Sequence, residues 1–173
     1  MKKTLIIVDV QNDFLAGGAL AVDTAGEEFV KKIESIRPLF DQVLLTADDH
    51  PVDHISFSDF PPHCVAGTKG AELAVEIGND KVLYKGRDKN EEEFSPFGDG
   101  KRIEYIEGDE IYVVGLAGDF CVKQSLLDLL QYLPSKKYYA ITDLIQSVDK
   151  TTYNPLDHFN KQVTFVTSGE LMR

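Results

Sequence analysis

Three of the four histidines in the 173-residue sequence fall in one short stretch, TADDHPVDHISFSDFPPHC, at positions 46–64. Asp48, His50 and His63 offer one carboxylate oxygen and two imidazole nitrogens, a ligand set that suits Zn²⁺, Fe²⁺ or Mn²⁺. His54 lies in the same stretch and could act as a fourth ligand. The stretch therefore predicts a metal site, with a histidine-rich surface loop as the alternative interpretation.

A thiol, a carboxylate and an amine stand at three other places where side chains could react. Asp9 lies near the end of the apolar run TLIIVDV, Lys85 ends the run KVLYK, and Cys121 follows the turn sequence GLAGDF. A cysteine thiolate can attack a carbonyl carbon, and a carboxylate beside it can take the thiol proton and return it to a leaving amine. A strand-to-helix turn at Cys121 would also direct backbone N–H groups at the developing oxyanion.

Each of these three side chains also has an ordinary structural explanation. Asp9 could be a turn residue, Lys85 a surface amine and Cys121 a small buried side chain. Their shared position at the ends of predicted strands favours the chemical interpretation. Because Cys121 also begins a predicted helix, where free N–H groups and the helix dipole stabilise a thiolate, we expect its pKa to be lowered.

The elements that must position these groups are predicted by hydrophobic pattern. Apolar runs rich in β-branched residues are continuous rather than alternating, which is typical of strands that are covered on both faces. Helical patterns separate them, and the first, at 24–40, opens with Thr24 and Glu27 at capping-box spacing. Strands that alternate with helices predict a three-layer α/β/α sandwich with a mostly parallel, doubly wound sheet. The predicted strands are 4–10, 42–47, 81–85, 110–117, 136–143 and 162–167, and a second helix is predicted at 119–133.

Composition limits the classes of protein to which the chain could belong. The net charge of −11 argues against a nucleic-acid surface, which needs clustered Lys and Arg. No window has the apolar length of a membrane span, and Asp9 interrupts the only run that resembles a signal peptide. We expect a cytoplasmic protein with a single domain over residues 1–173 and no disulfide framework. The acidic run NEEEF at 90–94 is interpreted as a solvated loop, and His158 as a solvated helix residue.

Six motifs, in order along nearly the whole chain, resemble those of the isochorismatase-like cysteine hydrolases, and most closely those of bacterial nicotinamidases, also called pyrazinamidases. The motifs are VDVQNDFLAGGAL (8–20), DDHPVDHISF (48–57), FPPHCVAGTKGAEL (60–73), YKG (84–86), FSPF (94–97) and GLAGDFCV (115–122).

The resemblance implies roles for particular residues. Asp9, Lys85 and Cys121 match the catalytic triad of the family, and the backbone N–H groups of Ala117 and Cys121 match its oxyanion hole. A cis peptide bond between Leu116 and Ala117 is implied as well. The ligands of one divalent ion, with Zn²⁺ expected before Fe²⁺ or Mn²⁺, fall on Asp48, His50 and His63, with His54 as the fourth ligand of some members; the pocket-lining positions fall on Phe14, Phe60 and Phe94.

The activity implied is hydrolysis of nicotinamide, and of pyrazinamide, to nicotinate and ammonia through a cysteine thioester in NAD salvage. The metal would bind the pyridine nitrogen and orient the ring, and a small amide would be the partner, with a homo-oligomer compatible with the sequence. The alternatives are a related amidohydrolase for a carbamoyl or ureido compound and, less favoured, an idle protein on the same fold. The sequence departs from the family at Phe60, where many members carry Trp, at Gly118, where Thr is expected, and in its short length.

Overall fold

The computed structural model describes residues 1–149, 159 and 161–173, so the interpretation of His158 lies outside the described residues. Within that part of the chain, six strands form one sheet in the order β3-β2-β1-β4-β5-β6, and every neighbouring pair is parallel. The predicted strands and the doubly wound topology are therefore confirmed. The strands are β1 (Lys3–Val8), β2 (Gln42–Asp48), β3 (Lys81–Lys85), β4 (Glu110–Leu116), β5 (Lys137–Gln146) and β6 (Val163–Val166).

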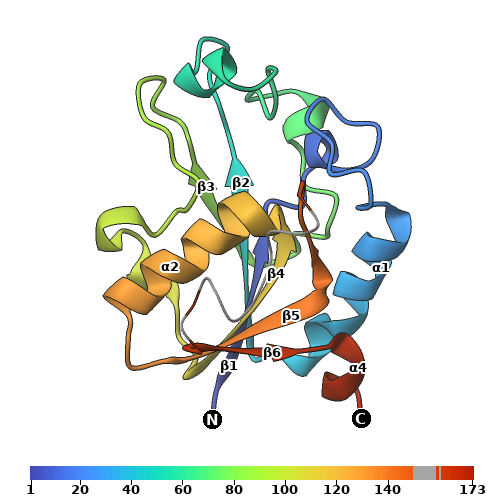
Figure 1. Cartoon of the computed structure of the whole chain (residues 1–173), viewed down its shortest axis with the longest axis vertical. Helices are drawn as coiled ribbons and strands as arrows, with labels where there is room; N and C mark the ends of the chain where they lie inside the picture. The colour runs from blue at the N-terminus through green and yellow to red at the C-terminus, as the bar shows by residue number, and fades with distance from the viewer. Residues whose placement is uncertain (150–158, 160) are drawn as a thin grey trace.

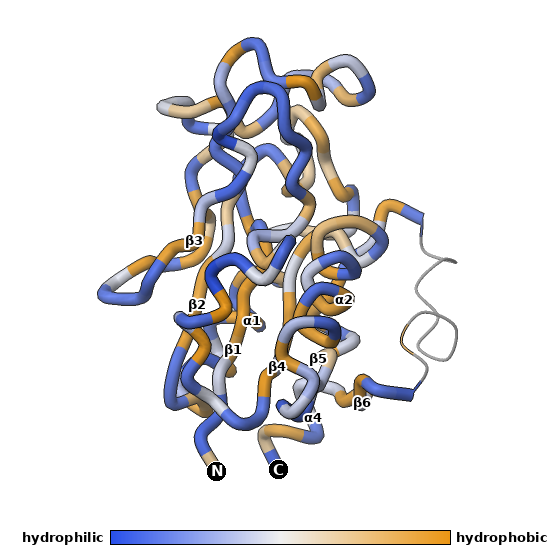
Figure 2. The backbone as a smooth tube through the Cα atoms, turned by 90° about the vertical axis from the view of Figure 1, so that its left-hand side faces the viewer, coloured by the Kyte–Doolittle hydropathy of each residue, from blue (hydrophilic) through white to orange (hydrophobic). Residues whose placement is uncertain are grey.

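Helices cover both faces of this sheet (Figure 1). On one face, Leu5 and Ile7 of β1 belong to the same buried cluster as the apolar side of α1 (Glu27–Ile36), and Leu171 of α4 (Ser168–Leu171) packs against it. On the other face, Ile6 and Val8 share a cluster with Leu126 and Leu129 of α2 (Lys123–Tyr132). Because neighbouring strand residues point to opposite faces, a continuous apolar run supplies both cores, as the apolar (orange) colouring of the strands in Figure 2 illustrates.

The first predicted helix differs from the structure at both of its ends. The helix α1 begins at Glu27, with Gly26 as its N-cap and no side-chain cap. The predicted capping box is therefore wrong, because the Thr24 hydroxyl donates a hydrogen bond to Gln146 Oε1 (2.7 Å) instead. The α-helix stops at Ile36 and continues as a 3₁₀ turn, Arg37–Leu39, since Pro38 has no N–H to donate.

The order of the strands determines which edge of the sheet carries the predicted reactive side chains. From β1 the chain adds β2 and then β3 on one side, and it then returns to add β4 on the other side of β1. In doubly wound sheets a crevice forms at such a reversal, outside the carboxyl ends of the strands. The long connection after β2, coloured teal to green, rises above that edge in Figure 1. No helix within the described residues is long and apolar enough to cross a membrane.

Candidate active site

Lys85, at the end of β3, is the centre of a buried polar cluster at this edge. Its Nζ donates a hydrogen bond to Asp9 Oδ2 (2.8 Å) and another to Asp48 Oδ1, and it lies 3.5 Å from Cys121 Sγ. Lys85 and Asp9 are fully buried, and Asp48 and Cys121 nearly so. The sheet order explains the meeting, because the strands that end near these residues are neighbours. The structure thus joins the three side chains of the predicted triad to one predicted metal ligand.

Asp9 is held in place by β2 as well as by Lys85. Its Oδ1 accepts a hydrogen bond from the Thr46 hydroxyl (2.6 Å), and its backbone, at φ 50°, donates to the Thr46 carbonyl (3.1 Å). Burial raises the pKa of the Asp9 carboxyl above its ordinary value, although the Lys85 ammonium opposes this. A carboxylate with a raised pKa is better suited to accept and return a proton.

The environment of Cys121 corrects one expectation. Burial raises the pKa of the Cys121 thiol well above its ordinary value, although Lys85 acts in the opposite direction. The expected lowering by a helix start is therefore wrong: Cys121 lies in a π-helical turn, Gly118–Val122, and loss of solvent, with the negative charges of Asp9 and Asp48, outweighs the favourable charge of Lys85. Asp9 belongs to the same buried cluster as this thiol.

Gly115 allows the end of β4 to approach β1 closely at this point. Its φ is +123°, and a Cβ added to it would lie 2.1 Å from the carbonyl oxygen of Val8, the residue before Asp9. Only glycine fits both the conformation and the space. The peptide bond between Leu116 and Ala117 is cis, as the resemblance implied. The close approach at Gly115 brings the turn that carries Cys121 next to Asp9.

The predicted metal ligands lie together. One ligand atom from each of Asp48, His50 and His63 falls within a 4.8 Å group. The Nε2 atoms of His50 and His63 are 3.5 and 3.9 Å from Asp48 Oδ2. Each ring is fixed by its other nitrogen, since Nδ1 of His50 bonds to the Gly86 carbonyl and Nδ1 of His63 to the Pro61 carbonyl, both at 2.8 Å. Such bonds orient imidazole ligands around an ion.

The Asp48 carboxylate, the neutral His63 ring and a buried nitrogen of His50 suit a divalent cation. Burial acts to lower the pKa of His50, but the hydrogen bond and the charge of Asp48 raise it. Burial would raise the pKa of Asp48, but Lys85 and His50 hold it well below its usual range. Burial lowers the pKa of His63, which keeps that imidazole neutral. His50 Nε2 is buried without a hydrogen-bond partner among the described residues, and a buried polar atom of this kind is costly unless it binds something. The donor set therefore fits the expected ion.

His54 is not brought into this ligand group. Its ring stacks on that of His50, with centroids 4.0 Å apart, and both of its nitrogens are already bonded. Nδ1 contacts the Ser56 hydroxyl (2.9 Å), and Nε2 contacts the Glu91 carbonyl (2.9 Å). His54 therefore lies outside the group of three in this structure, and its ring connects the Glu91 segment to His50.

We expect His54→Ala to keep its metal content but to lose stability. Removal of the ring leaves the Glu91 carbonyl without its partner, which should lower the free energy of unfolding by about 1–3 kcal/mol. Metal analysis of the purified variant and denaturant unfolding measure the two quantities. Loss of the metal with unchanged stability would restore the interpretation of His54 as a ligand.

A cavity of about 290 Å³ opens beside Cys121. The three predicted aromatic residues, Phe14, Phe60 and Phe94, line it together with Ala117 and two of the predicted ligands, Asp48 and His63. Phe120 completes the aromatic wall, with ring centroids 5.9 Å from Phe60 and 5.8 Å from Phe94. The sequence analysis missed Phe120, although it directly precedes Cys121. It also missed four further lining residues, Leu20, Val22, Glu92 and Val148.

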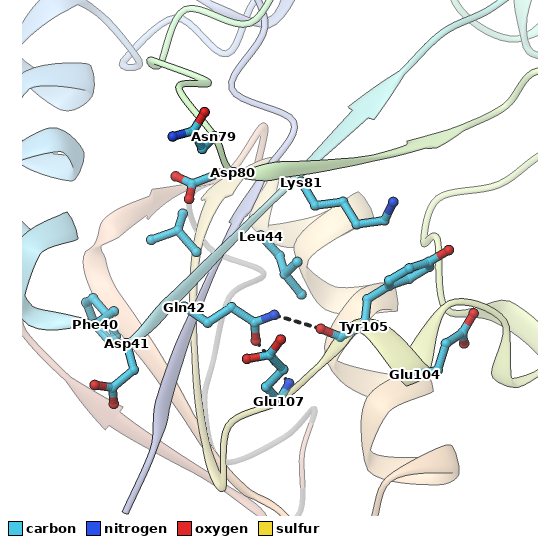
Figure 3. Close-up of a pocket in the computed structure, with 11 residues that line it drawn as sticks. Phe40, Asp41, Gln42, Leu44, Asn79, Asp80, Lys81, Glu104, Tyr105 and Glu107 are labelled. Carbon is cyan, nitrogen blue, oxygen red and sulfur yellow. Dashed lines mark hydrogen bonds between the residues drawn. The ribbon is translucent and has the colours of Figure 1, made fainter.

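A second cavity, of about 440 Å³, lies at the opposite edge of the sheet, near the starts of β2 and β3 (Figure 3). Gln42 Nε2 donates to the Tyr105 carbonyl (2.7 Å), and Lys81 Nζ lies 4.2 Å from the centre of the Tyr105 ring. Of its acids, Asp80 pairs with Arg37 and Glu107 with Lys2. It contains neither cysteine nor histidine, so the chemistry belongs to the cavity beside Cys121.

Comparison with known proteins gives one consistent result. Residues 3–155 match the isochorismatase domain family. The nicotinamidase of Acinetobacter baylyi is 32% identical over 84% of this chain and 81% of its own length. The pyrazinamidase of Pyrococcus horikoshii in complex with zinc superposes with a TM-score of 0.83 at 26% identity, covering 96% of this chain and 99% of that one. PnC1 from L. infantum, in complex with nicotinate, gives 0.86 at 29% identity over 97% and 93%.

Proposed function

The chain belongs to the isochorismatase family, and on that premise we propose that it is a nicotinamidase, which hydrolyses nicotinamide and pyrazinamide to nicotinate or pyrazinoate and ammonia. The observation that carries the proposal is the meeting of Lys85 with Asp9, Asp48 and Cys121 beside an aromatic-walled cavity. A flat ring can pack among the phenylalanine side chains while its carboxamide faces the thiol. The similarity to nicotinamidases supports this choice over amidases for carbamoyl or ureido compounds.

The side chains of the buried cluster would act in the following sequence of steps. Asp9 takes the proton of Cys121, and the sulfur attacks the carboxamide carbon, while the backbone N–H groups of Ala117 and Cys121 hold the oxyanion. Asp9 then gives the proton to the departing amine, which leaves as ammonia and yields a thioester. Water, with Asp9 again as the base, attacks the thioester and releases nicotinate and the thiol. Lys85 stabilises the anionic forms of Asp9 and Cys121.

Asp48, His50 and His63 would hold one divalent ion, and the zinc complex of the Pyrococcus horikoshii pyrazinamidase favours Zn²⁺. When bound, such an ion supplies a Lewis acid for the pyridine nitrogen of the substrate. The ion and the aromatic wall would together hold the ring, with the carboxamide toward Cys121.

The direct test is turnover of nicotinamide by the purified protein, followed by ammonia release, with the metal content measured on the same sample. We expect hydrolysis that requires stoichiometric divalent metal. If nicotinamide is untouched while a non-aromatic carbamoyl or ureido compound is hydrolysed, the chain is the related amidohydrolase instead.

Benzamide tests the role of the ring nitrogen. It has nearly the shape of nicotinamide but lacks the nitrogen, so it keeps the packing on Phe14 and Phe60 and loses one positioned contact. We expect kcat/KM for benzamide to be lower by about 10²-fold or more, whereas pyrazinamide, which keeps the nitrogen, remains a substrate. Similar kcat/KM values for benzamide and nicotinamide would show that the nitrogen does not orient the substrate.

A further inference from the structure

Three consecutive glutamates, Glu91, Glu92 and Glu93, follow β3, and the structure gives them three different environments. Glu93 is tied to the protein, because its Oε1 accepts a hydrogen bond from the Gly86 N–H (2.9 Å). Glu91 lies 3.6 Å from Lys101 Nζ, at the surface. Glu92 lines the cavity beside Cys121. The interpretation of this acidic run as a solvated loop is therefore confirmed for Glu91 and Glu92, which are exposed, whereas Glu93 is half-buried and bonded.

The Glu92 carboxylate is the charged group of the cavity wall that the mechanism does not use. The other acid in the lining is Asp48, which is bonded to Lys85 and faces the histidine ligands. Within the described part of the chain, no hydrogen bond or ion pair is formed by the Glu92 side chain. Its charge is therefore not neutralised by a partner among the described residues, and it lies at the solvent-exposed rim of the cavity.

The segment around Glu92 is fixed on both sides. The Glu91 carbonyl is bonded to His54 Nε2 (2.9 Å), and Glu93 is held by Gly86 and by Arg102, whose Nη1 lies 3.4 Å from Glu93 Oε2. The following residue, Phe94, packs against Phe120 in the cavity wall. Such anchoring keeps the Glu92 side chain at the rim of the cavity.

The surroundings of Glu92 show that it is within electrostatic reach of the reactive cluster. Partial burial raises the pKa of the Glu92 carboxyl above its ordinary value, and the negative charge of Asp48 adds to this effect, while the positive charges of His50 and Lys85 oppose it. An anion bound in the cavity beside Glu92 would be exposed to the negative charge of that carboxylate. A neutral carboxamide does not experience this repulsion, but a carboxylate does.

We propose that Glu92 sets the charge preference of the cavity, so that neutral ring amides enter while the carboxylate product is repelled and anionic ring compounds are excluded. The proposal rests on the proposed function, which turns a neutral amide into an anion at this site. A single charge at a partly solvated rim should change the affinity for an anion by about three- to tenfold, with a strong dependence on salt.

Glu92→Gln tests the proposal, with Glu91→Gln as the matched control. Both variants remove one negative charge at adjacent positions, but the Glu91 side chain does not line this cavity. The dissociation constant of nicotinate is measured by calorimetry for the wild-type holoenzyme and both variants, at low and high salt. For Glu92→Gln we expect about three- to tenfold tighter nicotinate binding at low salt and a smaller gain at high salt. The control should match the wild type.

Several outcomes would overturn the proposal. These are unchanged nicotinate affinity in Glu92→Gln, an equal gain in the Glu91→Gln control, a gain that does not depend on salt, or no nicotinate binding in any of the three proteins. Because binding is measured without turnover, the result does not depend on hydrolysis. Wild-type protein that fails to hydrolyse nicotinamide would refute the proposed function, while the comparison of the two variants would still decide the role of Glu92.

Discussion

Replacement of Cys121 by alanine is expected to lower kcat for nicotinamide hydrolysis by about four powers of ten or more. The variant loses the only atom placed to form the thioester, and the remaining groups cannot form a covalent intermediate in its place. The fold and the metal content should be nearly unchanged, because the substitution removes one sulfur from the edge of a cavity and leaves Asp48, His50 and His63 intact.

The second cysteine provides the control for this experiment. Cys64 is fully buried in the core on the α1 face and does not line the cavity beside Cys121, so its thiol has no access to a substrate bound there. Cys64→Ala should therefore keep most of the activity. Retention of even a tenth of the wild-type kcat in Cys121→Ala would exclude the covalent mechanism.

The second large effect is expected from the metal ligands. His50→Ala and His63→Ala each leave two of the three grouped ligands, and two protein ligands hold a divalent ion weakly. We expect each variant to bind the metal at least about 10²-fold less tightly and to lose most of its activity. Metal analysis after gel filtration, together with titration of Zn²⁺ into the stripped protein, measures the loss.

His54→Ala serves as the control here, since its ring lies against His50 but outside the ligand group. Part of the lost activity in His50→Ala and His63→Ala should return when excess Zn²⁺ is added, because mass action refills a weakened site. Full metal occupancy in both variants without added metal would show that the ion is held elsewhere.

Lys85 connects these two experiments. Its ammonium contacts Asp9 of the proposed triad and Asp48 of the proposed metal site, so the charge of each carboxylate affects the other through Lys85. Asp48 and Asp9 together raise the pKa of Lys85 well above its ordinary value, although burial acts to lower it. A buried ammonium is stable here because its attraction to two carboxylates offsets the free-energy cost of removing it from water.

The sequence by itself determined the framework and the chemical groups of the site. Hydrophobic pattern is a local property, because a strand buried on both faces must be apolar along its whole length. The runs that became β1 to β6 could therefore be read directly, and a parallel sheet then required their carboxyl ends to share an edge. The positions of Asp9, Asp48 and Lys85 near those ends followed from the same pattern, without any knowledge of distances.

Other features depended on contacts between segments that are distant in the sequence. The raised pKa of Cys121 depends on how completely the folded chain excludes water from the thiol, which no local motif specifies. His54 is a possible ligand by type and spacing, and only the tertiary structure places the Glu91 carbonyl at its second nitrogen. Glu91, Glu92 and Glu93 are identical in type, and only the fold separates a surface acid, a cavity-lining acid and a bonded one. Local sequence thus fixed which groups were available, and long-range packing decided their solvation and their partners.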